Sequence, residues 1–321
     1  MSLSSREESP NQNGWKKSEF SVQTVKKILI IGASGFVGGC VLAAAEGRIN
    51  EIFASFRTRP LEFPGVRSFP LDITLGYAVR RVVTEMQPEA VIHCAALAGM
   101  DYCEENPDEA FRVNAGAVKN LAGACQEAQT RLIFLSTDMV FDGKRGNYSE
   151  KDTTGPLSVY GRSKCEAERC IEKNCENFVI ARAALIYGRP FTGSNSASEK
   201  ILADLRRGIP VRLFRDQYRT PIRVDELALS LLELAEGEFT GLIHLGGPER
   251  VDRLTFGREL AGISGFSEDL ILSVSMKDVS LKAPRPRDSS LDISLAKDLL
   301  RTRISGYHEG LELSYKGKNF R

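Results

Sequence analysis

The chain has 321 residues, of which 42% are hydrophobic and 26% are charged, and its formal net charge is +1. This composition is ordinary for a globular protein, and the balanced charge offers no overall field for nucleic acid or an anionic membrane. No apolar run reaches the roughly 18 residues that a membrane span needs. We therefore expect a cytoplasmic protein that acts through local sites.

The N-terminal segment, residues 1–25, is rich in Ser, Asn, Glu and Lys and lacks the apolar core of a secretory signal. We expect this segment to be disordered. The seven cysteines are irregularly spaced, and several fall in apolar runs, where a reduced thiol behaves as a small hydrophobe. The run of Cys165, Cys170 and Cys175 fits no common zinc-binding pattern, so we predict no metal site.

From residue 27 onward, short apolar runs alternate with helical patterns. We predict strands at 27–32, 52–56, 66–71, 90–94, 131–136 and 178–181, and helices around 40–45 and at 78–86, 107–128 and 159–173. Strands that alternate with helices imply βαβ units with right-handed crossovers. The sequence thus predicts an α/β fold whose doubly wound parallel sheet forms a Rossmann domain over residues 26–187. Ligands of such a sheet bind at the carboxyl ends of its strands.

After residue 188 this alternation weakens, and glycine, proline and arginine become frequent. Helical patterns remain at 198–207, 224–235 and 254–263, with strand-like pieces at 211–214 and 242–245. We interpret residues 188–321 as a smaller C-terminal lobe that covers the substrate. The piece at 242–245 is a candidate for one further strand of the main sheet.

A glycine-rich run follows the first strand and opens a helix. Gly32 permits a tight turn, Gly35 lets the backbone approach a pyrophosphate, and Gly38 lets the helix pack closely on the sheet. Free N–H groups at the helix start favour phosphate, so Ser34, Phe36 and Val37 belong to the predicted cofactor site as well. A glycine-rich turn without a ligand is the alternative, and the flanking strand and helix argue against it.

The end of the second strand indicates which dinucleotide binds. An NAD site usually has an acidic residue there, but this strand ends in Phe56, Arg57 and Thr58. Because a guanidinium suits a phosphate dianion, we predict NADP(H) rather than NAD(H). The alternative is that Arg57 is simply solvated. At the end of the third strand, Leu71 and Asp72 are further candidates, and Asp72 is suited to accept a hydrogen bond from the adenine amino group.

Small residues follow the fourth strand at Cys94, Ala95 and Ala96, where they would let the backbone pass beside the cofactor. Asn114 lies in the predicted long helix at 107–128. Its amide either braces neighbouring backbone on the inner side of this helix or belongs to an ordinary helix surface.

Tyr160 and Lys164 are four residues apart, so they share one face of a predicted helix. Free phenol has a pKa of about 10, and we expect the neighbouring ammonium to lower the pKa of Tyr160. Tyr160 would then act as the acid when a carbonyl is reduced. Thr137, at the end of the fifth strand, can hydrogen-bond the same substrate oxygen, and Lys164 is expected to hold the nicotinamide ribose.

Together these motifs resemble the extended short-chain dehydrogenase/reductases. Within that group, the runs at 135–143, 156–164 and 285–292 are similar to motifs of the dTDP-4-dehydrorhamnose reductase family. The resemblance covers about residues 27–300. Three positions depart from the family pattern: Met139 replaces a tyrosine, Asp288 replaces an asparagine, and Arg219 stands in a run that keeps only part of the family motif. Arg219 either meets a diphosphate or belongs to ordinary surface.

The resemblance implies NADPH-dependent reduction of a 4-keto-6-deoxy nucleotide sugar, with Thr137, Tyr160 and Lys164 as catalytic residues. The partner is then the nucleotide sugar, and a homodimer is one option for assembly. The family includes a second branch, the regulatory β subunit of methionine adenosyltransferase, which also keeps Tyr-x3-Lys. A cofactor-binding regulatory subunit that partners a synthetase is therefore the alternative. Another extended reductase or an epimerase is the third option, and the missing acid after the second strand weighs against an epimerase.

Overall fold

Seven parallel strands form one central sheet in the computed structural model, which describes residues 25–192 and 196–317. The order across the sheet is β11, β6, β5, β4, β1, β2, β3. These strands are β1 (Lys27–Ile31), β2 (Glu51–Phe56), β3 (Val66–Pro70), β4 (Ala90–His93), β5 (Arg131–Thr137), β6 (Phe178–Ala183) and β11 (Gly241–Leu245). The order changes direction beside β1, as in a Rossmann sheet, which confirms the predicted doubly wound α/β fold.

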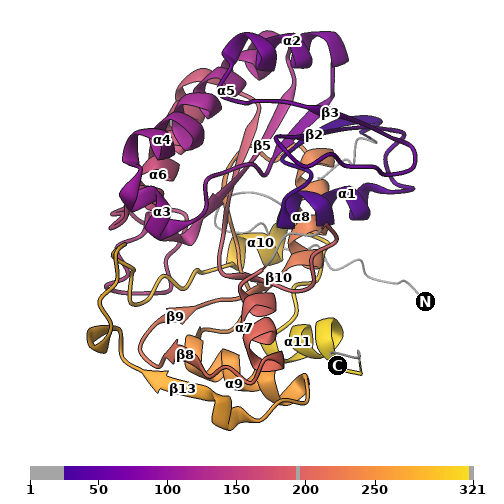
Figure 1. Ribbon diagram of the computed structural model, residues 1–321. Helices are drawn as coiled ribbons and strands as arrows, with labels where there is room; N and C mark the ends of the chain where they lie inside the picture. The colour runs from indigo at the N-terminus through magenta and orange to yellow at the C-terminus, as the bar shows by residue number, and fades with distance from the viewer. Residues whose placement is uncertain (1–24, 193–195, 318–321) are drawn as a thin grey trace, which may run out of the picture.

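Helices cover both faces of this sheet (Figure 1). On one face α1 (Phe36–Ala45) packs against α8 (Val224–Glu236); on the other lie α2 (Gly76–Met86), α5 (Ala117–Glu127) and α6 (Val159–Asn174). Side chains of β1 alternate between the two apolar layers: Ile28 and Ile30 join the first, and Leu29 and Ile31 the second. A strand buried on both faces reads as a continuous apolar run, which is why its position could be predicted.

The predicted helix at 107–128 is helical throughout, but it is not one regular α-helix. It consists of α4 (Pro107–Phe111), a π-helical turn at Arg112–Gly116, and α5. A π turn inserts an extra residue into the helical repeat, so a search for 3.6-residue periodicity does not detect it. Asn114 lies in this turn and is 1% exposed, so of its two alternatives the ordinary helix surface is wrong.

A second lobe lies beyond one end of the sheet (Figure 1). It contains α7 (Ala197–Arg206), α9 (Arg253–Ile263), α11 (Tyr307–Tyr315), and the parallel pair of β8 (Val211–Phe214) and β13 (Ile271–Val274). Its own apolar core includes Leu202, Leu205, Phe256, Leu260 and Leu311. The chain leaves this lobe to form α8 and β11, and the candidate strand at 242–245 pairs with β6 within the main sheet.

Several short elements have no counterpart among the predicted ones. They are α3 (Met100–Glu105), β7 (Ile186–Tyr187), β9 (Tyr218–Arg219), β10 (Ile222–Arg223), β12 (Val251–Asp252) and α10 (Ser294–Leu299), together with β13 and α11. Strands of two residues are too short to show a hydrophobic period.

The predicted disordered tail falls almost wholly on residues 1–24, which lie outside the described residues. Its last residue, Val25, is buried against the core. Within the described ranges, no helix is both long and apolar enough to cross a bilayer.

Candidate active site

The glycine run between β1 and α1 forms a backbone cradle that leaves no room for side chains. Gly32 has a φ of +84°, and a Cβ atom there would lie 2.8 Å from the backbone nitrogen of Ala95. A Cβ atom at Gly38 would overlap the carbonyl oxygen of Gly32. The first turn of α1 leaves N–H groups without intrahelical partners, so this cradle suits a phosphate group.

Beside the cradle lies a cavity of about 210 Å³ at the carboxyl ends of β1, β2, β3 and β4. Ten of the predicted cofactor residues line this cavity: Gly32, Ser34, Gly35, Phe56, Arg57, Leu71, Asp72, Cys94, Ala95 and Ala96. Sequence reasoning missed six further lining residues: Ile31, Ser55, Ile73, Thr74, Leu97 and Val113. Most of these six are apolar, and nothing in their type marks them as part of a site.

The remaining predicted cofactor residues lie outside the lining of this cavity. Phe36 and Val37 form the first turn of α1, where Val37 packs its side chain into the core. Thr58 is exposed. Thr192 is a residue that sequence reasoning missed: its hydroxyl donates to the carbonyl oxygens of Ser34 and Gly35, at 3.1 Å each. It thereby ties the chain after β7 to the cradle.

Asn114 braces the loop that follows β4. Its side-chain oxygen accepts from the Leu97 backbone N–H at 2.8 Å, and its amide donates to the Leu97 carbonyl at 3.1 Å and to the Ser163 hydroxyl at 3.0 Å. The π turn that carries Asn114 is thus linked to both the cavity wall and α6.

At the ends of β2 and β3, Arg57 and Asp72 stand close enough to interact. Hydrogen bonds from Thr74 are the largest cause of the lowered pKa of Asp72, and the charge of Arg57 lowers that pKa further. The Arg57 side chain is exposed and lines the cavity. A cation therefore stands at the strand end where the sequence predicted a phosphate contact.

Tyr160 and Lys164 lie on the first two turns of α6, beside the end of β5. A Cβ atom at Gly161 would overlap the carbonyl oxygen of Met139, so glycine allows α6 to approach the turn after β5 this closely. The Ser158 hydroxyl caps the helix by accepting from the Gly161 N–H at 3.2 Å. This close approach brings Tyr160 near the hydroxyl of Thr137, which acts to lower the pKa of Tyr160. The three predicted catalytic residues are therefore neighbours.

The pKa of Tyr160 is raised, which contradicts the expectation that Lys164 lowers it. Burial is the largest cause, and the charge of Asp138 adds to it, while the hydrogen bond with Thr137 acts in the opposite direction. Lys164 is not among the groups that shift the pKa of Tyr160, and burial lowers the pKa of Lys164 itself to about 7. The phenol therefore keeps its proton at neutral pH, as a proton donor requires.

Lys164 is 2% exposed. Its ammonium donates to the Leu135 carbonyl at 2.7 Å and lies 3.9 Å from the centre of the Phe134 ring. Glu168 and Cys94 raise the pKa of Lys164, opposing the effect of burial. These contacts hold the end of a flexible side chain between β5 and α6.

A buried ion pair lies behind Thr137. The Arg219 Nε lies 3.2 Å from an Asp138 carboxylate oxygen, and both side chains are less than 5% exposed. The Ser289 hydroxyl donates to the same carboxylate at 2.7 Å, and the Thr137 hydroxyl donates to it at 3.2 Å. Of the two options left open for Arg219, ordinary surface is therefore wrong, because its charge pairs with Asp138 inside the protein.

The three positions that depart from the family pattern lie close together. Arg219 contacts the sulfur of Met139 at 3.8 Å, and the negative charge of Asp288 raises the pKa of Arg219 against the larger, opposite effect of burial. Asp288 itself accepts from Arg250 at 2.7 Å. The guanidinium of Arg219 thus lies beside Met139. Two of the departures from the family pattern, Asp288 and Arg219, therefore place an acidic and a basic side chain near each other.

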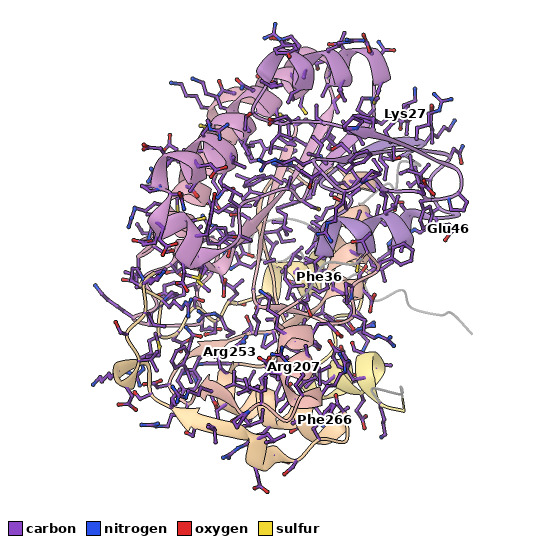
Figure 2. The ribbon with its side chains drawn as sticks, viewed as in Figure 1. Lys27, Phe36, Glu46, Arg207, Arg253 and Phe266 are labelled. Carbon is purple, nitrogen blue, oxygen red and sulfur yellow. The ribbon has the colours of Figure 1, made fainter. Side chains whose placement is uncertain are left out.

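Arg253 is a further candidate site residue, which sequence reasoning missed. It begins α9 at the edge of the second lobe that faces the sheet layer (Figure 2). Burial and the charges of Arg219 and Arg285 lower its pKa to about 10. Among the described residues, none accepts a hydrogen bond from its guanidinium, whereas Arg285 pairs with Asp101 at 3.1 Å. The opposite lobe thus offers a guanidinium that donates no hydrogen bond within the described parts of the chain, although the charge of Asp138 acts on it.

All seven cysteines have free thiols. Over residues 25–192 and 196–317, no group of His, Cys, Asp or Glu side chains is arranged to hold a metal ion.

The fold and this cradle define a nucleotide-cofactor-binding protein of the Rossmann class. Residues 26–319 match the sequence profile of the family described as RmlD substrate binding domain, so the chain belongs to that family, which includes dTDP-4-dehydrorhamnose reductases. The family depends on nicotinamide cofactors.

Individual relatives agree with this assignment. A probable low-salt glycan biosynthesis reductase of Haloferax volcanii is 32% identical, over 83% of this chain and 89% of that protein. The methionine adenosyltransferase 2 subunit beta of Mus musculus is 26% identical, over 90% of this chain and 87% of that one. Among solved structures, dTDP-4-dehydrorhamnose reductase of Bacillus anthracis in complex with NADP superposes with a TM-score of 0.78 at 25% identity, covering 90% of this chain and 98% of that one.

Proposed function

We propose that the protein is an NADPH-dependent reductase that converts the keto group of a 4-keto-6-deoxy nucleotide sugar to a hydroxyl. The observation that carries this proposal is the meeting of Thr137, Tyr160 and Lys164 beside the glycine cradle. A proton donor, a hydrogen-bonding hydroxyl and a buried ammonium are the groups that carbonyl reduction requires.

The cradle fits a dinucleotide because Gly32 and Gly38, where a Cβ atom would collide with the backbone of Ala95 and of Gly32, allow the tight turn that leads into α1. The N–H groups of Phe36 and Val37 would hold the phosphates, and the walls formed by Leu71 and Ala95 would enclose the adenosine. Lys164 would hold the nicotinamide ribose. When bound, the reduced nicotinamide supplies the hydride for reduction of a carbonyl.

The residues around the keto oxygen have separate roles in donating the proton and in orienting the oxygen. Tyr160 donates its phenolic proton to the oxygen as the carbonyl becomes an alcohol, and burial keeps that proton in place until then. The hydroxyl of Thr137 orients the same oxygen. The ion pair behind Thr137, between Asp138 and Arg219, holds this strand end in position.

Arg253 supports a substrate with a diphosphate. We expect Arg253→Gln to raise KM for the nucleotide sugar by about 10- to 100-fold, because hydrogen bonds to charged groups contribute roughly 1.5–3 kcal/mol. kcat and NADPH affinity should change little, since Arg253 lies on the opposite lobe from the cradle. Steady-state kinetics against Arg258→Gln, an exposed position on the same helix, provide the control. An unchanged KM in Arg253→Gln would show that Arg253 does not bind the substrate.

Arg57 supports NADPH over NADH. We expect Arg57→Ala to weaken NADPH binding by about 10- to 100-fold and to leave NADH binding within about twofold, because only NADPH carries the 2′-phosphate. Titration of both cofactors at fixed ionic strength measures the difference. Arg80→Ala, an exposed position that pairs with Glu127, controls for loss of a surface charge. Equal losses for both cofactors would contradict a phosphate contact.

The direct test is incubation of the purified protein with NADPH and dTDP-4-dehydrorhamnose while the absorbance of the reduced nicotinamide is followed. Oxidation of NADPH with formation of the 4-hydroxy sugar supports the proposal. Cofactor binding without turnover, together with co-purification of a methionine adenosyltransferase catalytic subunit, would favour the regulatory alternative, which the 26% identity to a β subunit brings forward. The same assay with other 4-keto nucleotide sugars separates the neighbouring substrate classes.

A further inference from the structure

The face of α6 that carries Tyr160 and Lys164 continues to a third ionisable residue one turn later. Glu168 follows Lys164 by four residues and is 4% exposed, although acidic side chains are rarely buried without a partner. Glu166 on the same helix is accessible and pairs with Arg169 at its surface. Helix geometry therefore places Glu168 on the catalytic face rather than in solvent.

Two strands of the sheet hold the Glu168 carboxylate. Arg182 of β6 donates from Nε to one carboxylate oxygen at 3.0 Å and from a terminal nitrogen to the other at 2.7 Å. Ser136 of β5, which directly precedes Thr137, donates its hydroxyl to the first oxygen. The Glu168 and Arg182 side chains are each only 5% exposed. A bidentate guanidinium and a hydroxyl thus fix the carboxylate behind the catalytic residues.

The surroundings of Lys164 leave few groups that can stabilise its charge. On α6, the Glu168 carboxylate favours the ammonium. On β4, His93 is buried, and burial together with the charge of Lys164 lowers its pKa to about 3. Cys94, which follows β4, favours the ammonium only when its thiol is ionised. On β5 the contacts are the Leu135 carbonyl and the Phe134 ring. Among the described residues around Lys164, the carboxylate that acts on the ammonium is therefore that of Glu168, which Arg182 also binds.

We propose that Glu168, held by Ser136 and Arg182, is a positioning residue that keeps the Lys164 ammonium protonated and in place for cofactor binding. This inference rests on the proposed role of Lys164 at the nicotinamide ribose. The fixed carboxylate offsets the cost of burying the ammonium, and Arg182 and Ser136 hold that carboxylate in one position. The catalytic motif thereby extends from two residues of α6 to three.

Cofactor binding tests this inference without turnover. We expect NADPH affinity of the unmodified protein to fall as pH rises through the pKa of Lys164, which lies at about 7. In Glu168→Gln the midpoint of that fall should move to lower pH by about one unit or more, because removal of the carboxylate charge favours neutral Lys164. NADPH fluorescence titrations from pH 5.5 to 9 measure this shift. Any change in the ionisation of NADPH affects the unmodified protein and the variant equally, so it does not contribute to the difference between their midpoints. Glu166→Gln should leave the midpoint unchanged.

Loss of Glu168 also leaves Arg182 buried without its partner, so the variants must separate charge from folding. Glu168→Gln combined with Arg182→Met removes both charges, and its midpoint should still lie below that of the unmodified protein. Glu168→Asp should return the midpoint toward its original pH. A midpoint that stays in place in both Gln variants, with only the melting temperature lowered, would overturn the inference. A protein that binds NADPH with the expected shifts but reduces no nucleotide sugar would overturn the proposed function alone.

Discussion

Replacing Tyr160 with phenylalanine is expected to lower kcat for reduction of the keto sugar by about 10²- to 10⁴-fold, the usual contribution of a positioned proton donor. NADPH affinity should stay within about twofold, because the phenol hydroxyl contacts Thr137 and is not part of the cavity lining. Single-turnover oxidation of NADPH and equilibrium binding measure the two quantities. Tyr102→Phe, which removes an exposed hydroxyl from α3, is the matched control.

The pH dependence of that reaction should follow Lys164 rather than Tyr160. Burial raises the pKa of Tyr160, so the phenol stays protonated throughout the neutral range. Burial lowers the pKa of Lys164 to about 7, so the ammonium is present below that pH and is lost above it. The rate in the unmodified protein should therefore decline as pH rises past about 7. A rate that stays constant from pH 6 to pH 9 would contradict a role for the ammonium.

The second large effect concerns the buried pair of Asp138 and Arg219. Arg219→Met is expected to lower the free energy of unfolding by about 3–5 kcal/mol, because it leaves a carboxylate buried without its cation. Denaturant unfolding, followed by circular dichroism at pH 5 and pH 8, measures the loss. Arg80→Met, which breaks an exposed pair with Glu127, should change stability by less than about 1 kcal/mol.

The sign of the pH effect distinguishes an unpaired charge from a simple cavity. Burial already raises the pKa of Asp138, and loss of Arg219 raises it further. A group whose pKa is raised by folding keeps its stability at low pH and loses it as pH rises through the folded-state pKa. The Arg219→Met deficit should therefore be larger at pH 8 than at pH 5. Asp138→Asn combined with Arg219→Met should recover much of the loss, whereas a cavity would give the same deficit at both pH values.

The fold and the glycine cradle were predictable because their signals are local. Strands β1, β2, β4, β5 and β6 each contain a short apolar run, and helices α2, α5 and α6 each have one apolar face. The cradle depends on Gly32, Gly35 and Gly38, whose spacing within one turn can be read directly. Tyr160 and Lys164 are likewise related by a single helical turn.

The limits of prediction appear where partners are distant in sequence. For Arg219 the sequence left a diphosphate contact and ordinary surface open, yet Arg219 pairs with a carboxylate 81 positions earlier in the chain, at Asp138. Arg253 shows no motif, and only its placement at the start of α9, near Arg219 and Arg285, makes it a candidate for an anion. The pKa of Tyr160 was expected in the wrong direction, because spacing indicates a nearby ammonium but not how much water burial removes.

The amino-acid sequence by itself determined the class of fold, the position of the glycine cradle and the Tyr-x3-Lys pair, since each depends on contacts within a strand, a turn or a helix. Only the tertiary structure decided that Glu168, Ser136 and Arg182 meet behind Lys164, that Asp138 is paired with Arg219, and that Lys164 is buried. The physical reason is that burial and long-range pairing arise when separate strands and helices pack together. The hydrophobic pattern of one segment does not indicate which charged residue of another segment will lie next to it.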